Sequence, residues 1–184
     1  MARGIDPAPV IAEECSAPIK SVGHSRTLRD DLEDRDAICA FLLQLAEMVG
    51  RRARRHRVSG RVVALTLRYA DFTGVSRQQV QPDYLDSSEA IYRAGVKILD
   101  SMVLDQPVRL LGIRLSGLRF RTGQLPLFAE ERRRFLLTEA RDSANDRYGE
   151  FTVMFGSLLE QQGKGSHVIS PAWRPQGVRN VAIR

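Results

Sequence analysis

The chain has 184 residues, of which 43% are apolar and 27% charged, a balance that favours one globular domain with tails and excludes a disordered or fibrous chain. Its formal net charge is +6 and most of its basic side chains are arginines, so a polyanion such as nucleic acid is the first partner to consider. No segment approaches the ~20 apolar residues that span a bilayer, and residues 1–9 do not resemble a signal peptide, so we expect a cytoplasmic protein without a membrane partner.

The first part of the chain predicts a tail followed by a long helix. Residues 1–19 are rich in proline and small side chains and show no period, which indicates a linker or tail. Five acidic residues between Asp30 and Asp36 precede an apolar helical period from Ile38 to Val49. The acidic start and the run of arginines at the end both complement the helix dipole. We therefore expect an amphipathic helix that Gly60 ends.

A hairpin is predicted after this helix. Apolar and polar residues alternate over residues 61–69, with Val63, Leu65 and Leu67 on one side, which is the pattern of a half-buried strand. Residues 71–74 are typical of a turn, and the polar run 75–81 fits an extended partner for the preceding strand.

A second helix and a last strand follow the hairpin. Asp86 and Glu89 have the spacing of a capping box and predict the start of a helix that Pro107 would end. Alternation over residues 108–120 then predicts another strand.

Together with an extended run at residues 20–28, these elements have the order strand, helix, strand, strand, helix, strand. The predicted fold class is α+β, a four-stranded antiparallel sheet with two helices on one face. The free face would carry Thr66, Arg68 and Arg114 and almost no aromatic residue. Such a face suits contact with the backbone of a duplex better than stacking on single-stranded bases.

Three segments carry a resemblance to a known family. Residues 20–28 (KSVGHSRTL) resemble its first strand, residues 68–72 (RYADF) the tip of its central hairpin, and residues 108–118 (VRLLGIRLSGL) its last strand. The three occur in the right order over about a hundred residues. The chain thus resembles the little finger domain, the C-terminal DNA-binding domain, of Y-family translesion DNA polymerases of the polymerase IV type.

The resemblance implies a domain at residues 20–120 that lies along duplex primer-template DNA and holds its phosphates through backbone amides and basic side chains. The residues that it assigns to DNA binding are Lys20, Ser21, His24, Ser25, Arg26, Thr27, Arg68, Thr73, Arg77 and Arg114. Two alternatives stay open: each arginine could be an ordinary solvated charge, and His24 could pack within its strand.

The same resemblance places catalysis in another part of a longer, error-prone DNA polymerase, where acidic residues hold two Mg²⁺ ions. The sequence here supplies no such carboxylates, so we expect no catalytic residue, no metal site and no cofactor in this chain. Its expected role is that of the C-terminal part of the enzyme.

Residues 121–130 contain the run Gln124, Leu125, Pro126, Leu127, Phe128, which resembles the peptide that docks bacterial polymerases on the sliding clamp. The glutamine would meet the polar edge of a pocket, and Leu125, Leu127 and Phe128 would supply apolar anchors. The alternative is a linker whose Leu127 and Phe128 pack on the domain.

Residues 131–184 are expected to form a C-terminal extension of unassigned role. A helical period covers residues 130–147, and residues 148–153 predict a turn into a short strand or an irregular segment. Two other functions remain possible: a stand-alone adaptor that binds the clamp without a polymerase, and a binder of single-stranded RNA on the same sheet.

Overall fold

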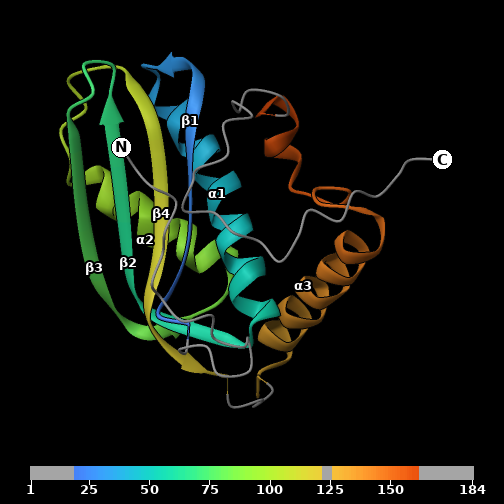
Figure 1. Ribbon diagram of the computed structural model, residues 1–184. Coiled ribbons are helices and arrows are strands. Elements are labelled where there is room, and N and C mark those ends of the chain that lie inside the picture. Colours follow the sequence, from blue (N-terminus) through green and yellow to red (C-terminus); the bar gives the residue numbers. More distant parts are fainter. Residues whose placement is uncertain (1–18, 122–125, 162–184) are drawn as a thin grey trace, which may run out of the picture.

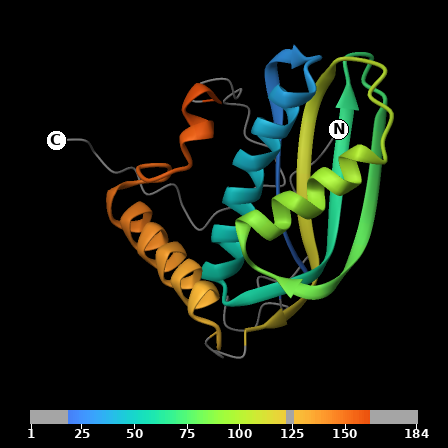
Figure 2. The same ribbon diagram turned by 180° about the vertical axis from the view of Figure 1, so that it is seen from behind.

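The structure, a computed structural model, describes residues 19–121 and 126–161. Four strands form one antiparallel sheet in the spatial order β1-β4-β2-β3, so that β1 and β3 are its edges. Helices α1 and α2 lie side by side on one face of the sheet (Figures 1 and 2). In chain order the elements are β1 (Ser21–Leu32), α1 (Arg35–Arg55), β2 (Val58–Tyr69), β3 (Gly74–Leu85), α2 (Ser88–Asp100) and β4 (Val108–Phe120). The predicted α+β fold is confirmed.

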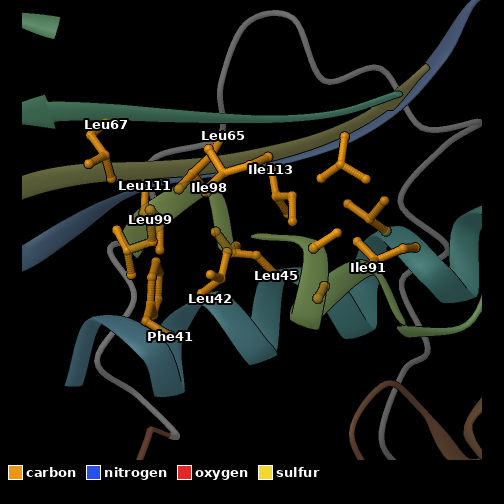
Figure 3. Close-up of a cluster of buried hydrophobic side chains, with 14 of the residues drawn as sticks. Phe41, Leu42, Leu45, Leu65, Leu67, Ile91, Ile98, Leu99, Leu111 and Ile113 are labelled. Atoms are coloured by element: carbon orange, nitrogen blue, oxygen red, sulfur yellow. The ribbon is translucent and has the colours of Figure 1, made fainter. Parts of the chain in front are cut away.

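The core lies between the sheet and the two helices. The predicted alternation is observed: Leu65 and Leu67 of β2 and their cross-strand partners on β4 are fully buried under the helices. The helices meet them with their apolar faces, as Phe41 and Leu45 of α1 illustrate (Figure 3). Burying each such side chain contributes roughly 1.5–3 kcal/mol, which makes this layer the main source of stability.

The ends of α1 differ from the prediction. The side chain of Asp34 caps the helix by accepting a hydrogen bond from the Ala37 N–H at 2.8 Å. Strand β1 runs on to Leu32, so part of the acidic cluster belongs to the strand rather than to the helix start. The helix ends at Arg55, and Arg57 takes the left-handed conformation (φ 52°) that reverses the chain. Gly60, predicted as the stop, lies inside β2.

The start and end of α2 also correct the prediction. Ser87, rather than Asp86, is the N-cap, and its hydroxyl accepts from the Ala90 N–H at 3.5 Å. The Asp86 carboxylate instead pairs with Arg121 at 2.8 Å. The helix ends at Asp100, well before Pro107.

The C-terminal extension begins with a helix, α3 (Ala129–Tyr148), as predicted. Residues 149–153 form no strand, so the irregular alternative is observed here. The side chain of Asn145 holds the backbone of Val153 instead: it donates to the Val153 carbonyl at 2.9 Å and accepts from the Val153 N–H at 2.8 Å. A 3₁₀ helix, η2 (Gly156–Gln161), follows and lies against α1, with Leu158 buried.

Candidate nucleic-acid interface

The face of the sheet opposite α1 and α2 is the candidate interface, and we call it the open face. The strand register aligns four residues from each strand into a grid, because residues paired across antiparallel strands point to the same side. The grid consists of Ser21, Gly23, Ser25 and Thr27 (β1), Leu110, Gly112, Arg114 and Ser116 (β4), Val62, Ala64, Thr66 and Arg68 (β2), and Gly74, Ser76, Gln78 and Val80 (β3).

The composition of the open face suits a polyanion. Arg68 and Arg114 are both exposed, and the grid positions include no aspartate or glutamate. Most of the remaining side chains are small or carry a hydroxyl, and the hydroxyls of Thr66 and Ser76 lie 3.0 Å apart. Because the grid holds no aromatic ring, it offers no platform for stacked bases.

Gly112 lies beside Ser25 at the centre of the open face. A Cβ atom at Gly112 would sit 2.7 Å from the Ser25 Cβ, closer than two carbon atoms approach. A glycine at position 112 therefore leaves room for the Ser25 side chain, which is exposed on the open face.

Five of the ten predicted DNA-binding residues lie on this grid: Ser21, Ser25, Thr27, Arg68 and Arg114. Lys20 is exposed just before β1. The sequence reasoning missed Ser76 and Gln78, which the alternation within β3 places on the same side as Arg68.

Thr73 lies at the tip of the β2–β3 hairpin. Its hydroxyl and its N–H both donate to Asp71 Oδ1, at 2.6 and 2.8 Å, and these bonds hold the pKa of that carboxyl below its ordinary value. The neighbouring Phe72 has φ 67°, and the guanidinium carbon of Arg109 lies 5.0 Å from the centre of its ring. The tip is thus a rigid turn whose hydroxyl is already engaged.

His24 and Arg26 lie on the other side of β1, the side that faces α1. They pair with Ile113 and Leu111, both buried in the core. Burial, together with the positive charges of Arg52 and Arg26, lowers the pKa of His24 from 6.5 to about 4. Its Nδ1 atom is buried and has no hydrogen-bond partner within the described part of the chain.

Arg77 also lies on the helix side of the sheet, where it pairs with the buried Leu65. Its Nη1 donates to the carbonyl of Ser101, the C-cap residue of α2, at 2.8 Å. A cation at the C-terminal end of a helix satisfies a free carbonyl and complements the dipole. Arg77 is therefore a structural side chain in this arrangement.

The sequence predicts that the arginines at the end of α1 complement the helix dipole. In the structure they also bind other elements. Arg52 donates to the carbonyl of Gly23 at 3.0 Å and so joins α1 to β1. Arg51, Arg54 and Arg55 bind carboxylates of α3. No local pattern could reveal these pairs, because their partners lie about ninety residues away.

The predicted docking peptide is only partly described. Gln124 and Leu125 lie outside the described residues. Leu127 and Phe128 are 88% and 67% exposed, so they do not pack on the domain as the linker alternative requires.

The described residues contain no group of three or more His, Cys, Asp or Glu that is placed to hold a metal ion. None of their helices has the length and apolar character required to cross a membrane.

Residues 19–127, more than half of the chain, match the model of the impB/mucB/samB family C-terminal domain. The chain belongs to this family. The four-stranded domain is accordingly the C-terminal, little finger domain of a Y-family polymerase, as the resemblance implied.

Curated relatives of this little finger domain are DNA polymerases. DNA polymerase IV of Pelotomaculum thermopropionicum is 36% identical over 176 residues, which cover 90% of this chain and 43% of that polymerase. DNA polymerase IV of Moorella thermoacetica is 38% identical over 154 residues, covering 83% and 38% of the two chains. The chain spans about two fifths of the length of the curated relatives that it matches.

Two solved structures match part of the chain at lower identity. One is a complex of the beta-clamp processivity factor and the little finger domain of PolIV, with a TM-score of 0.46, 19% identity, and coverage of 59% of this chain and 98% of that chain. Another is DinB from Sulfolobus solfataricus, with a TM-score of 0.46, 15% identity, and coverage of 56% and 31%.

Proposed function

We propose that this chain is the DNA-holding C-terminal part of a lesion-bypass DNA polymerase and that its open face lies along duplex primer-template DNA. The observation that carries the proposal is the open face, where Arg68 and Arg114 stand among small and hydroxyl side chains without a carboxylate. Contacts of this kind grip phosphates without reading the base sequence. A polymerase that copies damaged templates needs such a grip.

The contact set that we propose is narrower than the one expected from sequence. Arg68, Arg114 and Lys20 would supply charge, and Ser21, Ser25 and Thr27 would supply hydroxyls and backbone amides along β1. We expect no direct phosphate contact from His24, Arg26 and Arg77, because their side chains lie on the helix face. Of the remaining predicted residues, Thr73 is the least able to contact a phosphate, since its hydroxyl already donates to Asp71.

The relatives support this assignment, because those that match the chain over most of its length are DNA polymerases. The chemical step would belong to the remainder of such an enzyme. We assign no catalytic residue to this chain, and the Mg²⁺ ions of the parent enzyme would be held elsewhere.

Fluorescence anisotropy with a labelled duplex tests the DNA proposal at several salt concentrations. Each phosphate contact contributes about 0.9 to the slope of log affinity against log salt. The double variant R68Q/R114Q should therefore bind more weakly and lose about 1.8 from that slope. The matched control R77Q/R93Q removes the same charge from the opposite side and should keep the wild-type slope. Equal losses in both variants would contradict an interface on the open face.

We also propose that Gln124, Leu125, Leu127 and Phe128 dock the chain on a sliding clamp. The exposure of Leu127 and Phe128 supports this, since two large apolar side chains left in water are free to enter a pocket. The little finger domain in one of the similar solved structures is itself in complex with a beta clamp.

Calorimetric titration of the chain into the sliding clamp tests the proposed docking. The variant L127A/F128A should lose measurable binding, because the apolar anchors carry most of the energy of such a peptide. The variant L136A/L137A is the matched control, since it removes two exposed leucines of α3 and should bind like the wild type. Unchanged binding by L127A/F128A would exclude the peptide as the docking element.

A further inference from the structure

Helix α3 attaches to the domain through charged side chains. The guanidinium of Arg54 holds both carboxylate oxygens of Asp142, with Nε at 2.6 Å and Nη2 at 2.9 Å. Asp146 accepts from Arg51 at 2.6 Å and from Arg55 at 2.5 Å. These bonds outweigh the partial burial of Asp146 and hold its carboxyl pKa below the ordinary value. A ladder of arginine–carboxylate contacts thus joins the C-terminal half of α1 to α3.

A fourth pair extends the ladder toward the middle of α1. Arg141 of α3 lies 3.2 Å from the carboxylate of Glu47, and both side chains are largely buried. Burial raises the pKa of Glu47 in spite of this partner. The pair therefore contributes less than its short distance suggests, because desolvation offsets much of the attraction.

Two leucines of α3 point away from the domain, whereas Phe135 is half-buried, with the guanidinium carbon of Arg121 5.6 Å from its ring centre. Helical spacing places Leu136 and Leu137 on the side opposite Asp142, and they are 54% and 70% exposed. Among the described residues of α3, only Asn145 is buried. The helix thus contacts the domain mainly through charged side chains, while its leucines and most of its other charged side chains face water.

This arrangement makes the attachment weak. The carboxylate of Asp146 is about half exposed, so its pairs are worth about 0–1 kcal/mol each and salt screens them. The Arg54–Asp142 and Arg141–Glu47 pairs are largely buried, so salt screens them less and desolvation offsets much of their attraction. The buried apolar surface that normally fixes a helix is almost absent here. By contrast η2, which follows α3, is anchored to α1 by Leu158, so release of α3 need not detach the rest of the extension.

The start of α3 connects this attachment to the candidate docking peptide. Phe128 is the N-cap residue of α3, and its carbonyl accepts from the Arg132 N–H at 2.9 Å. Leu127 and Phe128 are therefore held at the base of the helix. As long as α3 is attached to α1, these two side chains must remain beside the domain.

We propose that α3 is a detachable arm, held on α1 by the pairs of Asp142 and Asp146 with Arg51, Arg54 and Arg55. Release of the arm removes the restraint on Leu127 and Phe128 and lets them reach a partner farther from the sheet. This consequence rests on the proposed docking of these residues on a sliding clamp. Detachment itself does not depend on any partner.

Energy transfer between two dyes tests detachment in the full chain. The dyes are placed at K97C on α2 and E139C on α3, in a background with C15A and C39A. Raising the salt from about 0.05 M to about 1 M shortens the screening length to ~3 Å and should lower the transfer efficiency as the arm leaves. D142N/D146N should show the low efficiency already at low salt. The control E130Q removes a carboxylate that pairs within α3, with Arg134, and should behave like the wild type.

Titration of the same variants into the sliding clamp tests whether release of the arm lets Leu127 and Phe128 dock more readily. D142N/D146N should bind the clamp at least about threefold more tightly than E130Q, because the freed peptide meets less obstruction from the domain. A transfer efficiency that responds neither to salt nor to D142N/D146N would overturn the proposal. If no variant binds the clamp while the efficiency still responds, the docking function fails and the detachable arm stands.

Discussion

Neighbouring residues of β1 serve different purposes because they point to opposite sides of the sheet. Ser25 lies on the open face, whereas His24 lies beneath α1 next to Arg52. The same division separates Arg68 from Arg77 on the central hairpin. A resemblance in sequence marks all four as candidates, but only the strand register shows which of them a ligand on the open face can touch.

Among single residues, His24 should make the free energy of unfolding depend on pH. Its pKa is about 4 in the folded chain and 6.5 when it is free, so between these values the unfolded state takes up a proton that the folded state does not. The free energy of unfolding should therefore fall as the pH drops from about 6.5 to about 4, by at most ~1.4 kcal/mol per pH unit. Above the pKa of the free side chain, His24 contributes nothing to this dependence.

Urea denaturation at a series of pH values measures the effect. Replacing His24 with glutamine should flatten the curve within this window, whereas a carboxylate with a lowered pKa such as Asp146 contributes slope only toward pH 4 and below. Identical slopes for H24Q and the wild type would show that His24 is freely protonated in the folded chain.

Among the elements, those built on a clear apolar period could be predicted from sequence. Alternation places Leu65 in the core, and helical spacing does the same for Phe41. The helix ends could not be predicted in the same way, because Arg57 takes the left-handed position where a glycine was expected. The α3 attachment was also out of reach, since it depends on pairs such as Arg54–Asp142 that join distant segments.

Gly60 provides a test at this scale, because it is part of β2 and does not end α1. A Cβ atom at this position would lie 2.5 Å from Leu115 Cγ and 2.9 Å from the Ser116 carbonyl oxygen. The substitution G60A should therefore destabilise the fold by about 1–3 kcal/mol through overpacking. Thermal or urea denaturation measures this loss.

The position of Gly74 supplies the control for that experiment. A Cβ atom there would meet only the Leu67 carbonyl oxygen, at an ordinary 3.5 Å, so G74A should cost much less than G60A. Equal stability of G60A and the wild type would indicate that Gly60 lies outside the packed sheet.

Across the whole molecule, the two faces of the sheet have different roles. One face joins α1 and α2 to form the core, and the other leaves Arg68 and Arg114 in water without a competing carboxylate on the grid. The extension adds α3 through ion pairs and leaves Leu127 and Phe128 exposed. Stability, the proposed DNA contact and the proposed clamp docking thus belong to three separate surfaces.

The measurement that tests this division most directly is nuclear magnetic resonance of the chain titrated with a short duplex. The side-chain Nε–Hε signals of arginine report contact with phosphate at each site. The account predicts large shifts for Arg68 and Arg114 and for the β1 amides around Ser25, with Arg77 and Arg52 unchanged. Shifts confined to Arg77, Arg52 and α1 would place the duplex on the helix side and contradict the central claim.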